Sequence, residues 1–393
     1  MNNFSFDNNE LYFIKSNING YRVSLYEIAN WKNGLAFRNI DFSPTGKPII
    51  KIAELNNGIT SSTSYTNQIF SDDFLLSKGD LVFSWSGNPQ TSIDIFKYNL
   101  PDGWLNQHIF KITPYENKIN KNYLFYIMKY LKPNFTQIAT NKQTTGLGHV
   151  TISDIKKISF ILPPLEVQKK IAGVLGALDD KIELNNKINQ NLEAQAQALF
   201  KSWFVDFEPF GGQMPDDWVE KTLEQFCRIF TGRKNANEYT PNGKNPFFTC
   251  APEPLRIDSH IYDGPAVIIA GNGAYTGRTR FYNGKFDLYQ RTYACTPLPD
   301  INQDYIYLLF VAVKMLLQEK IMGGTHGSAV PYIVMNDIAK FNFFFDEEVF
   351  NKLSPIMKYY VENILANEQE NAKLAELRDT LLPKLMSGEI IIQ

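Results

Sequence analysis

The sequence predicts an α+β protein made of two copies of one mixed domain, each followed by a long helix. The first observation is an apolar seam of helical spacing in residues 162–208, which is far longer than an ordinary globular helix. The second is the return of this seam near the C-terminus, and the third is the return of strand and helix motifs ahead of it. Repetition with variable loops in between is typical of a duplicated domain.

The composition indicates a folded protein of ordinary charge. Of 393 residues, 44% are hydrophobic and 20% are charged, which excludes a disordered chain. No run approaches the ~20 apolar residues of a membrane span, and the N-terminus lacks the features of a signal peptide, so we expect a cytoplasmic protein. The net charge of −2 gives no global attraction to nucleic acid, so charge for DNA binding has to be local or supplied by partner chains.

Residues 1–164 are expected to form the first mixed domain. After an Asn-rich lead-in come three strand-like runs, KPIIKIAEL, GDLVFSWSG and WLNQHIFKITP. The pattern of NKNYLFYIMKYLK predicts a helix, a polar loop from Lys142 to Gly146 follows, and the strand ISFILP leads to the seam. Strands rich in aromatic and β-branched residues beside a helix predict an α+β domain.

The first long helix is expected over residues 165–208. Pro163 and Pro164 can precede a helix but not lie within it, and Pro209 with Gly211 and Gly212 ends it. The seam is apolar except at two central asparagines. Its positions are Ile171, Leu175, Leu178, Ile182, Asn185, Asn189, Leu192, Ala196, Leu199 and Trp203.

Residues 209–345 are expected to repeat the first domain. QHIFKITP from Gln107 matches QRTYACTP from Gln290, and the helix YLFYIM from Tyr123 matches YIYLLF from Tyr305. The second long helix is then expected over residues 346–393, where both central asparagines recur 182 positions later. Two long helices with the same interrupted seam are best explained as partners for each other.

The start of the second long helix differs from that of the first. It follows FFF rather than a pair of prolines, and Asp346 can cap its N-terminus. Pro355 lies inside it and is a candidate kink.

No catalytic or cofactor motif is found in the sequence. AVIIAGNGAYTG has the glycines of a dinucleotide-binding loop, but RTRFYNGKF follows with an Asn-Gly turn signal and no helical period, so a loop between strands is predicted. Its counterpart in the first domain is residues 86–91. The four histidines lack metal-ligand spacing, and His108 is interpreted as a strand residue. The three cysteines are expected to be reduced, and the chain is expected to be a binding protein.

Polar and aromatic side chains in the loops are the candidates for nucleic-acid contacts. Arg reads guanine and Asn or Gln reads adenine through paired hydrogen bonds, while Lys and Thr commonly bind phosphates. The candidates in the first domain are Arg38, Asn88, Gln90, Lys142 and Gln143. Those in the second are Arg233, Lys234, Asn272, Tyr275, Arg278, Arg280, Thr325 and His326, all taken to lie in loops or turns. A solvated loop residue is the alternative for each, and recurrence in both copies favours the group.

The segment from LPPLEVQKKIAGVLGALDDK to ALFKSWFVDFEP closely resembles the central region of type I restriction–modification specificity subunits. NAKLAELRDTLLPKLMSGEI resembles their distal region, and the two-copy layout is similar along nearly the whole chain. The resemblance implies two target-recognition domains with mixed sheets, each reading half of a bipartite DNA site. It also implies that two long antiparallel helices separate them as a coiled-coil spacer with pseudo-two-fold symmetry.

The same resemblance implies the partners of the chain. These would be double-stranded DNA, two modification subunits that use S-adenosylmethionine, and restriction subunits that use ATP and Mg²⁺, while this chain holds no cofactor. Two alternatives stay open, namely a DNA reader for another phage-defence methylation complex and a coiled-coil scaffold without DNA contact. A small-molecule enzyme would rest only on the glycine loop.

Antiparallel pairing makes a prediction for the four seam asparagines. Asn185 is expected opposite Asn371 and Asn189 opposite Asn367, whereas parallel helices would match Asn185 with Asn367. Such pairs stabilise poorly but hydrogen-bond each other, and a slipped register would leave them facing Leu or Ile. We therefore expect them to fix the alignment of the helices. The alternative is that this stretch faces water or a partner subunit.

Overall fold

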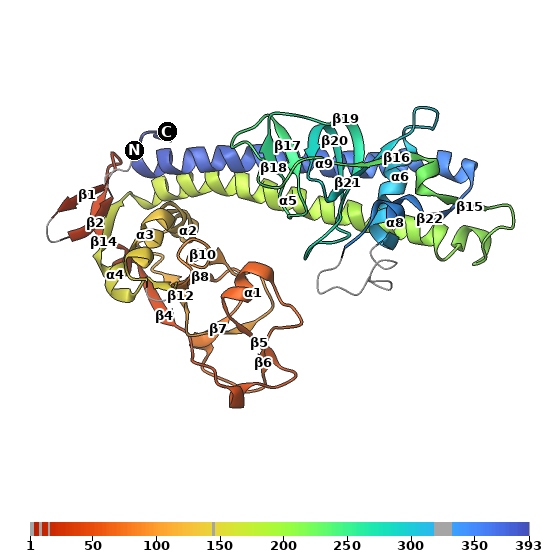
Figure 1. Cartoon of the computed structure of the whole chain (residues 1–393). Helices are drawn as coiled ribbons and strands as arrows, with labels where there is room; N and C mark the ends of the chain where they lie inside the picture. Colours follow the sequence, from red (N-terminus) through yellow and green to blue (C-terminus); the bar gives the residue numbers. More distant parts are fainter. Residues whose placement is uncertain (1–3, 8–9, 15, 144–145, 318–331, 393) are drawn as a thin grey trace. The chain divides into compact units, whose positions relative to one another are not determined.

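The structure is a computed structural model that describes residues 4–7, 10–14, 16–143, 146–317 and 332–392 (Figure 1). The chain divides into two compact units, one formed by Met1–Ile182 with Ala372–Gln393 and the other by Glu183–Asn371. Two long helices, α5 (Leu165–Phe204) and α9 (Glu347–Ser387), are yellow-green and blue in Figure 1 and contribute residues to both units.

The first unit contains the first mixed domain, built on an antiparallel sheet of order β10-β8-β12-β4. A second sheet has the order β6-β5-β11-β7, with β5 and β11 parallel, and a third has the order β1-β2-β14-β3. The strands are β1 (Phe4–Asp7), β2 (Glu10–Ile14), β3 (Tyr21–Ser24), β4 (Ala29–Asn33), β5 (Lys47–Ile50), β6 (Tyr65–Thr66), β7 (Leu75–Leu76), β8 (Leu81–Ser84), β9 (Ser86–Gly87), β10 (Asp94–Lys97), β11 (Gly103–Leu105), β12 (Ile109–Pro114), β13 (Gly148–His149) and β14 (Ile158–Leu162). The helices are α1 (Ile52–Asn57), α2 (Lys121–Tyr130), α3 (Lys132–Asn141) and α4 (Ile152–Lys157).

The run KPIIKIAEL is a strand only in its first half. β5 ends at Ile50 and α1 begins at Ile52, because the carboxylate of Glu54 accepts a hydrogen bond from the backbone N–H of Lys51 at 2.9 Å and caps the new helix. The strand predicted over the second half of this run is therefore wrong. The signal for the helix was Glu54, a capping carboxylate three residues after Lys51, from whose backbone N–H it accepts.

The second unit contains the second mixed domain, built on a sheet of order β16-β21-β19-β20-β17-β18 beside the antiparallel pair β15 and β22. The strands are β15 (Val219–Thr222), β16 (Cys227–Thr231), β17 (Asn245–Phe248), β18 (Leu255–Ile257), β19 (Tyr262–Ala270), β20 (Thr279–Leu288), β21 (Thr292–Pro297) and β22 (Asn342–Phe345). The helices are α6 (Tyr305–Ala312), which continues as a π-turn over Val313–Leu317, and α8 (Met335–Ala339).

The two domains share one strand order. In each of them a hairpin, β8–β10 or β19–β20, pairs through its first strand with β12 or β21, which in turn pairs with β4 or β16. The single long strand β20 also takes the place of β11, since its end pairs parallel with β17 as β11 pairs with β5. The predicted duplication is thus visible as the same topology in both domains.

The Asn-Gly turn predicted in RTRFYNGKF is wrong. Asn283 and Gly284 lie inside β20, where they pair with Pro265 and Gly264 of β19. Gly264 has a φ of 142° and Gly284 a φ of 135°, so two glycines face each other in a conformation that other residues rarely adopt. The hairpin turn lies instead at residues 271–278, as predicted for the glycine-rich loop.

The long helices begin where the sequence indicated. α5 starts after Pro163 and Pro164, and it ends at Phe204, ahead of a short 3-10 helix over Glu208–Phe210. The carboxylate of Asp346 accepts from the backbone N–H of Val349 at 2.9 Å and caps α9.

The helical assignment of α9 runs through Pro355 to Ser387. Leu353 and Met357, on either side of the proline, are buried in the core of the second unit. We attribute the continuity to this packing, which outweighs the one lost backbone hydrogen bond.

The cores of the two units use the same elements. In the first unit, Ile171 and Leu175 of α5 and Leu385 of α9 join the sheet and helices of the first domain in one apolar cluster. In the second, Phe200 and Phe204 of α5 and residues 349–361 of α9 join the second domain. All three cysteines are free, and no helix in the described residues is long and apolar enough to cross a membrane.

Candidate nucleic-acid interface

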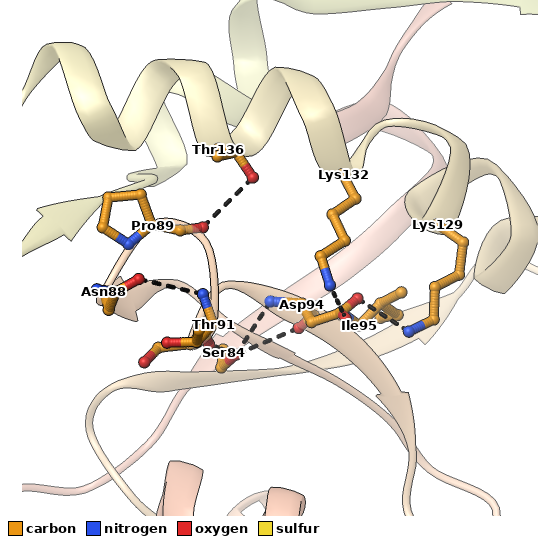
Figure 2. A network of polar contacts seen from close by, with 10 residues as sticks. Ser84, Asn88, Pro89, Thr91, Asp94, Ile95, Lys129, Lys132 and Thr136 are labelled. Atoms are coloured by element: carbon orange, nitrogen blue, oxygen red, sulfur yellow. Dashed lines mark hydrogen bonds and ion pairs between the residues drawn. The ribbon is translucent and has the colours of Figure 1, made fainter. Parts of the chain in front are cut away.

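The loop between β8 and β10 holds the candidates Asn88 and Gln90 in a fixed conformation (Figure 2). The side-chain oxygen of Asn88 accepts from the backbone N–H of Thr91 at 3.2 Å, as Figure 2 shows. It also accepts from the backbone N–H of Gln90 at 3.0 Å. The hydroxyl of Thr136 on α3 donates to the carbonyl of Pro89 at 3.3 Å. Paired hydrogen bonds to adenine need both the oxygen and the NH2 group of an amide side chain. The oxygen of Asn88 already accepts the hydrogen bonds of this turn, so the exposed Gln90 is the better candidate.

Asp94 connects this loop to the two helices beside it. Its carboxylate accepts from the ammonium of Lys129 on α2 at 2.9 Å and from Lys132 on α3 at 2.6 Å, as Figure 2 shows. Burial would raise the pKa of Asp94, but the two lysines outweigh it and hold that pKa below its ordinary value. The ion pairs therefore stabilise the position of the loop at neutral pH.

Asp94→Asn is expected to lower the free energy of unfolding by about 1 kcal/mol at pH 7, because the lysines lose a partner that is only 15% exposed. A depressed pKa gives stability that is present above the unfolded value of 3.8 and lost as the pH falls below it. Urea unfolding at neutral and acid pH should show the difference shrinking near pH 3. The exposed Asp102→Asn is the control, and an equal loss at both pH values would contradict this account.

The other candidates of the first domain are spread over its surface. Arg38 is exposed, and its backbone N–H donates to the carboxylate of Asp41 at 2.7 Å. Lys142 forms an ion pair with the buried carboxylate of Asp154, so its charge is partly committed within the domain. Gln143 is exposed next to it.

In the second domain the loop over residues 271–278 brings together three candidates. Tyr275 is exposed, and the guanidinium of Arg278 lies over its ring, 5.5 Å from the centroid. Asn272 is half-buried and forms a backbone bridge with Tyr332. A cation stacked on an exposed aromatic ring at a loop tip is an arrangement suited to contacts with bases.

Arg280 does not lie in a loop as predicted. It belongs to β20, where its guanidinium donates to the carbonyl of Pro252 and lies 5.7 Å from the ring centroid of Phe248. Burial, together with the charge of Arg278, lowers the pKa of Arg280. These contacts lie within the second unit, so the side chain supports the fold.

The remaining candidates are less informative. Arg233 is exposed, and the carbonyl of Lys234 accepts from the backbone N–H of Gln290 at 3.0 Å. Thr325 and His326 lie outside the described residues. Within those residues, no group of His, Cys, Asp and Glu side chains could hold a metal ion.

Sequence reasoning missed one shared feature of both domains. His108 and Arg291 occupy the same tight turn, where Ile109 donates to Asn106 at 3.1 Å and Thr292 donates to Tyr289 at 2.9 Å. His108 therefore lies in a turn and not in a strand. The aligned runs QHIF and QRTY carried the signal, because they place an Arg where the other copy has a His.

The seam asparagines form the cross-pairs of antiparallel helices. The amide of Asn185 donates to the side-chain oxygen of Asn371 at 2.9 Å, and the amide of Asn367 donates to Asn189 at 2.7 Å. Asn185 is fully buried and also donates to the carboxylate of Glu370 at 2.7 Å. All of these contacts lie within the second unit, and the stretch does not face water at Asn185.

Two copies of one α+β domain with divergent loops, together with a pair of long antiparallel helices, define a protein of two recognition domains. This is the predicted fold class. The family model of the type I restriction modification DNA specificity domain matches residues 21–194 and 215–345. The chain belongs to this family.

The chain is similar to specificity subunits of known type I restriction enzymes. The type I restriction enzyme MjaIX specificity subunit of Methanocaldococcus jannaschii is 27% identical over 333 residues, which cover 73% of each chain. The EcoDI specificity subunit of Escherichia coli is 32% identical over 185 residues, which cover 46% of this chain and only 40% of that relative. The crystal structure of the type I system S subunit from M. genitalium has a similar fold, with a TM-score of 0.62 at 17% identity, over 95% of this chain and 99% of that one.

Proposed function

We propose that this DNA-specificity subunit reads a bipartite site, with residues 1–164 reading one half and residues 209–345 the other. The observation that carries this proposal is a backbone frame that both copies share, namely the turn over residues 106–109 in one and 289–292 in the other, with the segments bonded to it. This frame displays different exposed side chains, His108 in the first copy and Arg291 in the second. Two readers that share a fold but differ in side chains suit a site whose halves differ. The helices, residues 165–208 and 346–393, would set the half-site spacing.

The charge of the chain is consistent with work inside a larger complex. A net charge of −2 provides little of the phosphate attraction that DNA binding needs, so partner chains would share it. We propose two modification subunits that carry S-adenosylmethionine as these partners, with ATP and Mg²⁺ belonging to restriction subunits. The specificity subunit is the non-catalytic member of such a system.

The modification subunits would dock on exposed apolar side chains of the long helices. Leu184 and Ile188 lie one turn apart on α5 and are 51% and 39% exposed, and Tyr359 on α9 is 62% exposed. Exposed apolar side chains on a helix pair are typical of a protein interface. Charged substitutions at Leu184 and Ile188 would test this placement by co-purification.

Exchanging residues 214–345 for the equivalent block of a related subunit is expected to change one half of the recognised sequence and leave the other half unchanged. The reason is that the block coincides with the second domain, whose described strands pair with one another. Methylation-sensitive sequencing of DNA modified by the assembled complex gives both halves of the motif in one measurement. A change in both halves, or in neither, would show that the domains are not independent readers. A complex that assembles but binds every sequence alike would favour the scaffold alternative.

A further inference from the structure

The turn that holds His108 forms part of an aromatic and polar surface in the first domain. The backbone N–H of Trp85 donates to the carbonyl of His108 at 3.2 Å, and its ring centroid lies 5.6 Å from that of His108 and 5.9 Å from that of His149. The Nδ1 atom of His149 is 2.9 Å from the hydroxyl of Ser86. The ring of Trp85 is itself stacked on Phe110, so the packing of the core fixes this surface.

The second domain builds the same frame with other side chains. The backbone N–H of Gly271 donates to the carbonyl of Arg291 at 2.9 Å, as Trp85 does to His108. A Cβ atom at Gly271 would lie 2.4 Å from that carbonyl oxygen and 2.6 Å from the ring of Tyr293, so this ring leaves no room for a side chain there. Asn272 pairs with Tyr332 in the way that Ser86 pairs with His149.

The frame continues along the chain in both copies. Val150 donates to the carbonyl of Trp85 at 2.8 Å, and Ile333 donates to the carbonyl of Gly271, also at 2.8 Å. Three backbone hydrogen bonds thus hold the frame in each domain: the one within the turn, the one to the carbonyl of the turn residue, and this third one. The side chain at the turn is exposed in both domains. Fixed backbone with exchangeable exposed side chains is what a base-reading position requires.

The chemistry of the two turn residues points to the same kind of ligand group. Arg291 has only donors, and a histidine ring donates through both nitrogens only when it is protonated. A base edge with two acceptors, N7 and O6 of guanine, accepts such donors in the major groove. An Arg in one copy and a His in the other would therefore read related edges with different dependence on pH.

Resting on the proposed function, we propose that this turn is a base-reading position in both domains. Arg291 contacts an acceptor-rich base edge in the half-site of the second domain. His108, whose ring lies near that of His149 across Trp85, makes the corresponding contact in the first half-site in its protonated form. Recognition of the first half-site then depends on pH near neutrality, whereas recognition of the second half-site does not.

The surroundings of the two histidines set the direction of the pH dependence. Burial and the nearby His149 lower the pKa of His108, so the free protein holds it neutral at pH 7 and above. Trp85, Ser86 and Gln107, which are neutral, contact the two rings. Among the described residues, no carboxylate forms an ion pair with either histidine. An anionic or acceptor-rich partner would raise the pKa of His108, so lower pH favours the bound state.

The test uses the chain assembled with its modification subunits and duplexes that carry the motif found by sequencing. Fluorescence anisotropy gives the ratio of Kd values for a duplex with one half-site altered and for the intact duplex. His108→Gln is expected to reduce this ratio roughly tenfold for the first half-site, the worth of one base contact, and to leave the second unchanged. Arg291→Gln is expected to do the reverse. Between pH 8 and pH 6 the ratio for the first half-site should rise several-fold in the unaltered complex and should stay constant in His108→Gln.

Two further variants separate the outcomes. His108→Arg is expected to keep discrimination and lose the dependence on pH, and His260→Gln, an exposed histidine of the second domain away from the turn, is expected to change neither half-site. If His108→Gln weakens binding to all duplexes alike, or changes nothing, the turn is not a base-reading position. If the domain exchange also fails to move a half-site, the proposed function itself is wrong.

Discussion

Arg280→Ala is expected to lower the free energy of unfolding of the second domain by about 2 kcal/mol, while Arg278→Ala leaves it within about 0.5 kcal/mol. The two arginines are two positions apart but differ in environment. Arg280 donates to the carbonyl of Pro252 and packs on Phe248, whereas Arg278 lies over the exposed ring of Tyr275. Urea unfolding of both variants measures the difference directly.

The pH dependence of Arg280→Ala gives a second readout through Glu368. Partial burial of the Glu368 carboxyl raises its pKa above 4.5, and the charges of Arg280 and Lys314 oppose that rise. A carboxyl with a raised folded pKa gives stability that is present below the unfolded pKa and lost as pH rises through the folded pKa. Without Arg280 the folded pKa moves further up. The loss of stability from about pH 5 to pH 7 should then be larger in the variant.

DNA binding separates the two arginines in the opposite sense. Arg278→Ala should relax one position of the second half-site at a cost of about 1–3 kcal/mol, whereas Arg280→Ala should act only through the stability of the domain. Lys285→Ala, at an exposed residue that is not among the candidates, serves as a control for loss of charge alone. Equal destabilisation by the two variants, or a change of base preference in folded Arg280→Ala, would contradict these assignments.

The long helices and the duplication were open to prediction because their signals are long. A seam kept over about 40 residues sums many weak preferences, and a motif repeated at nearly constant offset excludes chance agreement. Asp346 as a cap followed from a local rule and is confirmed. Each of these features can be recognised from the pattern of residues along the chain, without knowing which distant segments pair in space.

The errors occurred where a distant strand decides the outcome. An Asn-Gly pair is a strong turn signal, yet Asn283 and Gly284 are held in β20 by pairing along the whole length of β19. Arg280 was taken for a loop residue because it lies only three residues after Gly277, at the second position of β20. His108 was missed as a candidate because the turn between β11 and β12 is too short to interrupt an apolar run.

The seam asparagines show both what spacing can predict and what it cannot. Spacing alone indicated which asparagines would face each other in antiparallel helices. It could not indicate that Asn185 would donate to Glu370 as well, or that its own oxygen would be buried without a hydrogen-bond partner among the described residues. Those details depend on how side chains pack around the seam. They also set the energetic cost of the asparagines.

Replacing Asn185, Asn189, Asn367 and Asn371 together by leucine is expected to raise the free energy of unfolding by about 2 kcal/mol. The buried oxygen of Asn185 has lost water without gaining a donor, and leucine would bury apolar surface at the same place. Asn185→Leu alone is expected to lower stability by about 1 kcal/mol, because Asn371 loses its donor. A double-mutant cycle of Asn185→Leu and Asn371→Leu measures the coupling between the two positions, which should account for the opposite signs of the single and the combined stability changes.

The same quadruple variant is expected to recognise DNA with altered half-site spacing. With leucine throughout the seam, a slip of one heptad no longer buries an unpaired amide, and seven residues at 1.5 Å correspond to about 10 Å, or roughly three base pairs of DNA. Methylation of duplexes with lengthened and shortened spacers, by the complex assembled on each variant, measures the tolerance. As a control outside the seam, the exposed Asn191→Leu should behave like the unaltered chain. A quadruple variant that is less stable than Asn185→Leu would contradict the expected gain in stability, and one that keeps strict spacing would show that the asparagines do not fix the register.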